Sequence, residues 1–343
     1  MRIEALDLGV DSVMAEQYRL YLAHMSHDRA DQPTLGQEAL RASMLSSQPG
    51  TSVEHWGARD AEGTLVGYFD MVLPERENRA HVHSIGWVHP EFRRRGVATA
   101  LYRRLGARAR DLDRHAVTFP TYESVPGGIV GHPIAGAAFC ESVGLTRALV
   151  EIRRRLDVTT VDSASLNELA ARAWTRAAEF EVVTWRDRAD DSLVADLAYL
   201  ESRLHSDVPT GDLEWEAAEF DVARWRGLEE MAAKRKRTQY YAAARHRPTG
   251  RLAAYTALIV PQRPRSHAIQ QTTVVAPEHR GRRLGTIVKL ANLRESRLAE
   301  PDLKYIDTTN ADENDHMIAI NDAMGFVLCD ATVSWQGPIK TIQ

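Results

Sequence analysis

A short basic segment occurs twice in this chain of 343 residues, and the second copy begins 187 positions after the first. The first copy is Val88-His-Pro-Glu-Phe-Arg-Arg-Arg-Gly-Val-Ala-Thr99, and the second is Val275-Ala-Pro-Glu-His-Arg-Gly-Arg-Arg-Leu-Gly-Thr286. A repeat of about half the chain length is typical of two similar domains in tandem. Each half is long enough to bury a hydrophobic core of its own.

Each copy of the segment stands between a β-rich stretch and a helical one. A strand, a Gly-containing turn and a helix start bring backbone N–H groups and the positive end of a helix dipole around one point. Such a point attracts phosphate groups. The sequence therefore predicts one site for a phosphate-bearing ligand in each half.

The order of the expected elements is the same in the two halves. From hydrophobic periodicity, we expect elements of the first half at 2–6, 18–25, 36–46, 53–59, 65–73, 81–88, 101–112, 116–119, 134–143 and 148–156. Those of the second half are expected at 181–185, 192–205, 239–244, 252–260, 269–275, 287–298, 304–307, 317–324 and 331–335. We expect domains at 1–157 and 180–343, joined by a linker helix within 158–179.

The bulk composition excludes several classes of function. The net charge of −4 argues against general nucleic-acid binding, which needs a basic surplus. No run of about 18 apolar residues exists, and the N-terminus has no apolar signal core. Two cysteines, Cys140 and Cys329, do not make a disulfide framework. We expect a cytoplasmic protein without nucleic-acid or membrane partners and without a metal.

The first copy resembles the acetyl-CoA-binding signature of the GNAT N-acetyltransferase superfamily. Arg93, Gly96 and Ala98 match the family pattern fully. In the second copy Arg280 and Gly285 match, whereas Arg283 stands at the first glycine position. The resemblance covers nearly the whole chain as two tandem copies, an arrangement similar to that of mycothiol synthase and related tandem acetyltransferases.

This resemblance implies an α/β (α+β) fold in which each domain has a mixed central sheet flanked by helices. It also implies acetyl-CoA as the co-substrate, held by a loop and by the strand before it. The implied cofactor-binding residues of the first half are Gly86, Trp87, Val88, Arg93, Arg94, Arg95, Gly96, Val97, Ala98 and Thr99. Those of the second half are Thr273, Val274, Val275, Arg280, Gly281, Arg282, Arg283, Leu284, Gly285 and Thr286, together with Asn314.

The segment from Asn314 to Phe326 resembles the closing strand–helix segment of the family. In the family the Asn helps to anchor the pantetheine, and a Tyr on the helix can protonate the leaving thiolate. Asn321 occupies the Tyr position in the second half and Cys140 occupies it in the first. Because the second half keeps this segment better, we expect it to be the catalytic half, with Asn321 as a candidate catalytic residue.

The proton acceptor is the least determined part of the site. An acidic run at 207–216, which includes Glu214, falls between two expected helices where substrate lids sit in this fold. Glu214 is therefore a candidate, although a solvated acidic loop with helix caps explains the same run. In the first half, His81 and His83 lie on one side of the strand before the loop.

The resemblance predicts an acetyl-CoA-dependent N-acetyltransferase that acts on the primary amine of a small molecule by direct attack on the thioester. We expect a monomer or a homodimer. Two alternatives stay open. Because the Tyr is missing from both halves, the chain could be a non-catalytic acyl-CoA-binding sensor or scaffold. Because the first half keeps the better loop, catalysis could also take place there.

Overall fold

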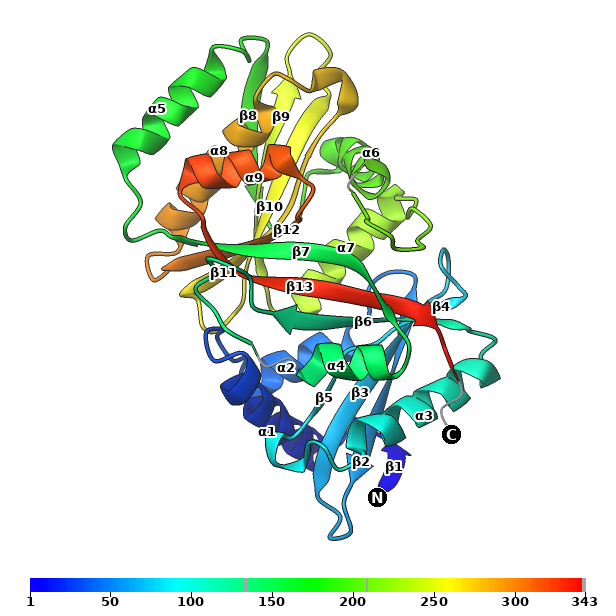
Figure 1. Cartoon of the computed structure of the whole chain (residues 1–343). Coiled ribbons are helices and arrows are strands. Elements are labelled where there is room, and N and C mark those ends of the chain that lie inside the picture. Colours follow the sequence, from blue (N-terminus) through cyan, green and yellow to red (C-terminus); the bar gives the residue numbers. More distant parts are fainter. Residues whose placement is uncertain (133–134, 208, 341–343) are drawn as a thin grey trace. The chain divides into compact units, whose positions relative to one another are not determined.

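The computed structural model of the chain describes residues 1–132, 135–207 and 209–340 (Figure 1). Contacts divide it into two compact units. The first unit consists of Met1–Glu151, Thr210–Glu216 and Asp330–Gln343, and the second of Ile152–Pro209 and Ala217–Cys329. The first unit thus takes in two segments from the second half of the chain. The expected boundaries at 157 and 180 stay a prediction, because contacts alone do not show which stretches fold independently.

The first unit has the strand order β1-β2-β3-β4-β6-β13, and β5 pairs with β3 (Figure 1). Its strands are β1 (Arg2–Ala5), β2 (Thr51–Arg59), β3 (Leu65–Pro74), β4 (His81–His83), β5 (Gly86–Val88), β6 (Ala116–Glu123) and the end of β13 (Val327–Pro338). Its helices are α1 (Asp11–Asp28), α2 (Gln37–Leu45), η1 (Pro90–Phe92), α3 (Val97–Asp111) and α4 (Ala135–Ser142). Strand β7 (Thr146–Asp157) leads from this unit into the second.

Two hydrophobic clusters cover the two faces of this sheet. Phe69 and Met71 of β3 pack with Leu105 of α3 in one cluster. Tyr68 of β3 belongs to the other cluster, with Met14 of α1. Because successive side chains of a strand point to opposite faces, α3 and α1 cover opposite sides of β3.

The second unit has the strand order β12-β11-β10-β9-β8 (Figure 1). Its strands are β8 (Phe180–Arg186), β9 (Thr238–His246), β10 (Leu252–Val260), β11 (His267–Val275) and β12 (Tyr305–Ala311). Its helices are α5 (Ser163–Trp174), α6 (Asp191–Asp207), α7 (Val222–Lys234), η2 (Pro277–His279), α8 (Leu284–Ala299) and α9 (Asp315–Met324).

The second unit repeats the layering of the first. Leu197 of α6 and Trp225 of α7 pack with Tyr255 of β10 in one cluster. Ala254 of β10 packs with Ile287 of α8 in another. A mixed sheet therefore lies between helices in each unit, and the expected α/β fold class is confirmed.

The expected elements appear in the expected order, most with shifted ends, but the strand expected over 81–88 is divided into β4 and β5. The first helix begins at Asp11, seven residues before the apolar pattern becomes clear. The helix expected over 134–143 is α4, although Ile134 lies outside the described residues. Within the described ranges, no helix combines the length and the apolar character needed to cross a membrane.

Candidate functional site

In the first unit, two neighbouring strands separate next to the repeated loop. β4 and β6 run parallel and pair from His81 to His83. The Ser84 N–H still donates to the Thr118 carbonyl at 3.0 Å. Beyond that point β5 pairs with β3, while β6 pairs with β13. One edge of β5 is therefore left open beside β6.

The backbone pattern shows which groups lie on this open edge. The Asp70 N–H donates to the Ile85 carbonyl at 3.0 Å, and the His89 N–H donates to the Val66 carbonyl at 2.9 Å. Because N–H groups alternate between the two sides of a strand, Trp87 shares the side that faces β3. The N–H groups of Gly86 and Val88 point to the open edge.

The second unit has the same arrangement. β11 pairs in parallel with β12 from His267 to Gln270. Residues 273–275 pair with β10, and the Ala276 N–H donates to the Ala253 carbonyl at 2.8 Å. By the same alternation, the N–H groups of Thr273 and Val275 point to the open edge, and that of Val274 does not.

The repeated loops share an unusual backbone conformation. Arg94 and Gly96 have φ angles of 60° and 80°, and Gly281 and Arg283 have 78° and 61°. These are matching positions of the repeat, so each loop has two left-handed residues of which one is glycine and one is arginine. Arg283 therefore departs from the family pattern in its side chain but keeps the backbone shape of Gly96.

Both loops lead directly into helices whose first N–H groups are available. The first backbone bond of α3 runs from the Ala100 N–H to the Gly96 carbonyl at 3.0 Å, and that of α8 runs from Ile287 to Arg283 at 3.2 Å. The preceding N–H groups belong to Val97, Ala98, Thr99, Leu284, Gly285 and Thr286, and they have no partner within the helix. A Cβ added at Gly96 or Gly281 would meet nothing within 4 Å. The arrangement fits a diphosphate.

The matching arginines Arg93 and Arg280 brace the loops through ion pairs. Arg93 Nη1 donates to Asp28 Oδ1 at 3.0 Å, and its Nε donates to the Val88 carbonyl at 3.2 Å. Arg280 Nη2 donates to Asp207 Oδ2 at 2.6 Å. Asp28 and Asp207 are the last residues of α1 and α6. The loops carry four further exposed arginines, Arg94, Arg95, Arg282 and Arg283.

The carboxylate of Asp28 accepts hydrogen bonds from several side chains. Burial alone would raise the pKa of its carboxyl group, but hydrogen bonds from His24, Arg93 and His27 hold that pKa well below its usual range. Asp207 has a lowered pKa as well, because hydrogen bonds from Ser206, Arg280 and Arg203 outweigh its desolvation. Both carboxylates are therefore ionised at neutral pH, as a brace for an arginine requires.

A carboxylate marks the point where the strands of the first unit separate. Asp70 Oδ1 accepts a hydrogen bond from the Ile85 N–H at 2.7 Å, and the Ser84 hydroxyl donates to the Asp70 carbonyl at 2.6 Å. Burial raises the pKa of Asp70 to about 7, against a smaller lowering by the bond from Ile85. A group that titrates near neutrality therefore lies beside the open edge of β5.

The second unit fills the same place with neutral groups. Ala257 stands at the repeat position of Asp70. The Gln270 amide donates to the Thr256 hydroxyl at 2.9 Å and to the Ala257 carbonyl at 2.6 Å. The irregular pairing of β10 with β11 is therefore held without a carboxylate.

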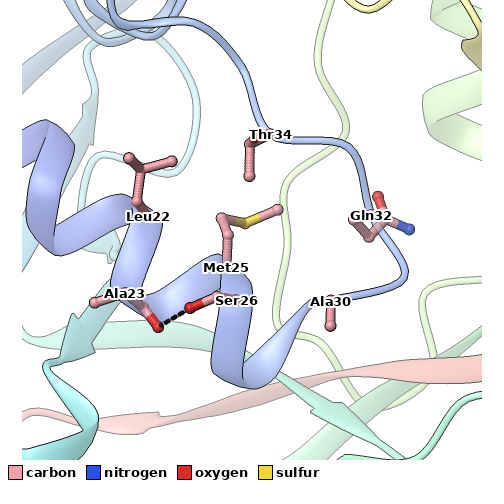
Figure 2. A pocket seen from close by; sticks show the side chains of 7 residues that line it. All are labelled: Leu22, Ala23, Met25, Ser26, Ala30, Gln32 and Thr34. Atoms are coloured by element: carbon pink, nitrogen blue, oxygen red, sulfur yellow. Dashed lines mark hydrogen bonds between the residues drawn. The ribbon is translucent and has the colours of Figure 1, made fainter.

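An aromatic face and a cavity lie on the α1 side of the first unit. The Trp87 ring stacks on His24 with centroids 5.1 Å apart and lies 4.9 Å from Tyr68. The indole Nε1 of Trp87 is buried without a hydrogen-bond partner among the described residues. A cavity of about 530 Å³ is lined by Leu22, Ala23, Met25, Ser26, Ala30, Gln32 and Thr34, from the end of α1 and the segment after it (Figure 2). Leu22 and Met25 also pack against the cluster that contains Tyr68.

The closing helices of the two units carry different polar groups. Burial raises the pKa of the Cys140 thiol in α4 to about 12. In α9, Asn321 accepts a hydrogen bond from Lys289 Nζ at 2.6 Å and donates one to Asn310 Oδ1 at 2.7 Å. Burial lowers the pKa of Lys289 to about 7. The buried polar chain Lys289–Asn321–Asn310 belongs to the second unit and has no counterpart at Cys140.

Asn314 caps helix α9. Its side-chain oxygen accepts a hydrogen bond from the Met317 N–H at 3.2 Å. Asparagine is among the preferred N-cap residues, so this contact explains its position without a ligand. A role of Asn314 in holding pantetheine stays a prediction.

The contacts of Glu214 belong to the first unit, and its role as proton acceptor stays a prediction. Its backbone N–H donates to Gln336 Oε1 at 2.7 Å, and its carbonyl accepts from Gln336 Nε2 at 3.2 Å. Nearby, the Glu216 N–H donates to Asn78 Oδ1 at 2.8 Å. These side-chain amides attach segment 210–216 to the first unit, whereas Asp207 stays with the second.

The histidines of β4 lie against this attached segment. The His83 ring lies 4.6 Å from the Trp215 ring, and the His81 ring lies 6.3 Å from it. Burial lowers the pKa of His83 to about 4, with a smaller effect from His81. Trp215 therefore packs over His83, which stays neutral at physiological pH.

Sequence reasoning missed Asp70 and Lys289, although each leaves a signal. Asp70 is the one charged residue of β3, and Lys289 is the one charged residue in the first ten positions of α8. A single charge in an otherwise apolar element is a reason to examine it. Among the residues that the structure describes, no three His, Cys, Asp or Glu side chains are grouped to hold a metal ion.

Comparisons with known sequences point to one family. The acetyltransferase (GNAT) family model matches residues 18–124. A mycothiol acetyltransferase from Salinispora tropica is 27% identical over 294 residues, which cover 84% of this chain and 83% of the relative. A mycothiol acetyltransferase from Salinispora arenicola is 26% identical over 298 residues, with the same coverage of both chains.

Solved structures give the same result. A tandem GNAT protein from the clavulanic acid biosynthesis pathway is similar with a TM-score of 0.81 and 27% identity, over 100% of this chain and 99% of that one. A GCN5-related N-acetyltransferase from Sphaerobacter thermophilus has a TM-score of 0.66 and 13% identity, over 98% and 96% of the two chains. The second likeness supports the fold alone.

Proposed function

We propose that this tandem N-acetyltransferase of the GNAT superfamily transfers an acetyl group from acetyl-CoA to the primary amine of a small molecule. The observation that carries the proposal is the pair of loops with left-handed residues at the same two positions, Arg94 and Gly96 in one and Gly281 and Arg283 in the other. Each leads into a helix start whose N–H groups suit a diphosphate.

The open strand edges support the position of the thioester. The N–H groups of Gly86 and Val88, or of Thr273 and Val275, would hold the amide and carbonyl oxygens of an extended pantetheine arm. Donors that are already in place stabilise the negative charge that develops on the acetyl oxygen during attack by an amine. A site of this kind supports direct attack, provided that the ammonium group first loses a proton.

Two observations favour a small acceptor. Both curated relatives are named mycothiol acetyltransferases. The cavity beside α1 has a volume of about 530 Å³, within the range of small-molecule sites. Its lining residues carry no charge, so we expect the acceptor to place a neutral part there.

We propose that the first half carries out the transfer. The sequence favours the second half through Asn314 and Asn321, but the first of these caps a helix and the second is a link in a buried chain. The cavity, the aromatic face around Trp87 and the titratable Asp70 all belong to the first unit. In this proposal the loop of the second half binds an additional CoA molecule.

Catalysis in the second half is the other candidate, and the chain Lys289–Asn321–Asn310 favours it. Asn321 stands where the family has its thiolate-protonating Tyr, and Lys289 has a pKa of about 7. A lysine in that state can exchange a proton near neutral pH.

The release of free thiol from acetyl-CoA tests the proposal. The full chain is mixed with acetyl-CoA and a panel of amino sugars, amino acids, polyamines and aromatic amines, and a thiol reagent follows the reaction. We expect release that depends on at least one amine, with the acetylated product confirmed by mass spectrometry. Tight binding of acetyl-CoA without amine-dependent release would favour the sensor or scaffold alternative.

A further inference from the structure

The carboxylate of Asp70 lies on the face of β3 that packs against the cluster of α1 in the first unit. Asp70 and Tyr68 are two positions apart on β3 and therefore lie on the same face. Tyr68 packs in the cluster of α1, together with the cavity-lining residues Leu22 and Met25. Asp70 thus shares its face of the sheet with the cavity.

Asp70 also lies next to the open edge of β5. Its Oδ1 is bonded to the Ile85 N–H at 2.7 Å, and Ile85 directly precedes Gly86, the first N–H on that edge. The side chain of Ile85 is 45% exposed, so the start of β5 is open to solvent. The second carboxylate oxygen, Oδ2, makes no hydrogen bond to another side chain among the described residues.

Three of the ionisable groups around Asp70, on β2, β3 and β4, are neutral near pH 7. His55 of β2 is its partner in register, and burial lowers the pKa of His55. Burial raises the pKa of Tyr68 on β3 well above its usual value, and it lowers that of His83 on β4 to about 4. His24 of α1, which stacks on Trp87, is paired with Asp28 at 2.8 Å.

We propose that Asp70 accepts the proton of the acceptor's ammonium group in the first unit. This inference rests on the proposed acetyl transfer. Asp70 Oδ2 takes one proton from the ammonium nitrogen, and the freed electron pair forms the bond from nitrogen to the acetyl carbon. The carbon–sulfur bond breaks, and its electron pair leaves with the sulfur. The second proton of the nitrogen ends on that sulfur as the free thiol, and Asp70 returns its own proton to water.

The second unit provides a matched control. Its repeat position holds Ala257, so this role has no counterpart there. It does hold another buried acid, Glu201 of α6, which is hydrogen-bonded to the Tyr255 hydroxyl. Burial raises the pKa of Glu201 to about 7 as well. A pH profile alone therefore cannot distinguish the two acids, but substitutions can.

The test compares Asp70→Asn with Glu201→Gln in the full chain, using an amine that the wild type acetylates. We expect Asp70→Asn to lower kcat/KM by about 10²- to 10⁴-fold while the Kd for acetyl-CoA, measured by calorimetry, stays within a factor of about two. The rise of kcat/KM with a midpoint near pH 7 should disappear in this variant and persist in Glu201→Gln. Asp70→Glu keeps a carboxylate and should restore part of the activity together with the pH-dependent rise.

Each result has a defined meaning. A wild type that acetylates no amine overturns the proposed function itself. An active wild type whose rate and pH profile survive Asp70→Asn overturns only the role of Asp70, and loss of the profile in Glu201→Gln would then assign the proton acceptor to the second unit. If Asp70→Asn does not fold, as judged by circular dichroism, a folded Asp70→Glu variant decides. Unchanged kcat/KM and an unshifted midpoint in that variant would also contradict the proposal.

Discussion

The loops of the two units share a backbone conformation, but their glycine stands at different positions of the repeat. The first loop has arginine and then glycine at its left-handed positions, Arg94 and Gly96, and the second has glycine and then arginine, Gly281 and Arg283. All four are exposed. A non-glycine residue pays a steric cost in this region, yet each loop accepts one. The comparison shows that the backbone shape is common to both units, whereas the place of the glycine is not.

The units differ more where acetyl transfer would occur. The first has Asp70 at the separation of its strands, and the second has Ala257 and the neutral Gln270 there. In the second unit, Lys289 of α8 is hydrogen-bonded to Asn321 of the closing helix α9. In the first unit, Tyr102 stands at the repeat position of that lysine. The geometry of the loops is therefore duplicated, whereas Asp70 and Lys289 each occur in one unit only. This pattern is what a duplicated fold would show if its copies took different roles.

For cofactor binding, the largest expected effect comes from removing one loop N–H in each unit. Ala98 and Gly285 are matching second positions of α3 and α8. Proline is tolerated in a first helical turn but has no N–H. We expect Ala98→Pro and Gly285→Pro each to weaken acetyl-CoA binding at their own site by about 10- to 100-fold, the value of a hydrogen bond to a charged group. Calorimetry resolves the two sites. Acetyl transfer should be slowed by Ala98→Pro, in the half that we propose to be catalytic, and not by Gly285→Pro.

The matched controls are Ala98→Gly and Gly285→Ala, which keep the N–H. They should bind acetyl-CoA within a few-fold of the wild type. Equal binding by both proline variants and the wild type would show that these helix starts do not hold the cofactor. The shared backbone conformation of the two loops would then reflect the common fold and not a common ligand.

The second prediction concerns the carboxylates that brace the loop arginines. Asp28 and Asp207 are buried to a similar degree, but Asp28 is shared by His27 and the more buried Arg93 and His24, whereas Asp207 pairs with the more exposed Arg280 and Arg203. Removing one partner of a buried pair costs more than removing a surface partner. We expect Asp28→Ala to lower the free energy of unfolding by about 2 kcal/mol, and Asp207→Ala by less than about 1 kcal/mol.

The pH dependence of the free energy of unfolding tests whether the effect of Asp28→Ala comes from the loss of an ionised carboxylate. The folded pKa of Asp28 is lowered, so its stabilising effect is complete above the unfolded value near 4 and is lost as the pH falls through the folded value. The difference between wild type and variant in urea unfolding should therefore be constant at pH 6 to 8 and shrink below about pH 4. A difference that grows in acid would contradict this ionic cause.

These contrasts also show which parts of the molecule the sequence predicts. The element order and both loops follow from hydrophobic periodicity and from local turn residues, so they were predictable without a structure. The positions of Glu214 and of the end of β13 depend on contacts with Asn78, Gln336 and β6. Those partners are far away in the sequence, and no local pattern announces them.

In the candidate site, too, the features with a local sequence signal were predictable, and those that depend on distant contacts were not. Gly86, Val88, Thr273 and Val275 were predicted as binding residues, and the strand pairing supplies a reason for them. The raised pKa of Asp70 depends on burial by α1 and by neighbouring strands, which a single sequence does not reveal. The helix-capping role of Asn314 has a local cause, since asparagine is among the preferred N-cap residues.

The third prediction uses the lysine that distinguishes the second unit. Lys289 is fully buried, and its folded pKa is lowered to about 7. The unfolded chain therefore binds more protons than the folded chain between about pH 7 and pH 10, and stability should rise with pH across that window. In Lys289→Met the part of this rise that Lys289 causes should disappear. Thermal unfolding from pH 7 to pH 10 measures it, and Tyr102→Phe at the matching position should leave the curve unchanged up to about pH 9. A rise that persists unchanged in Lys289→Met would show that another group causes it.

The smallest expected effect returns to the left-handed arginines. A left-handed conformation costs a non-glycine residue about 1 to 2 kcal/mol, and glycine loses about 0.4 to 1 kcal/mol through its more flexible unfolded chain. The balance predicts that Arg94→Gly and Arg283→Gly each stabilise the protein by about 0.5 to 1 kcal/mol. The reverse changes, Gly96→Arg and Gly281→Arg, should destabilise it by a similar amount, since an added Cβ meets no atom within 4 Å. Urea unfolding of the four variants measures these differences. If all four are destabilised alike, the arginine side chains themselves hold the loops, and the exchange of glycine between the two units has a cause other than backbone strain.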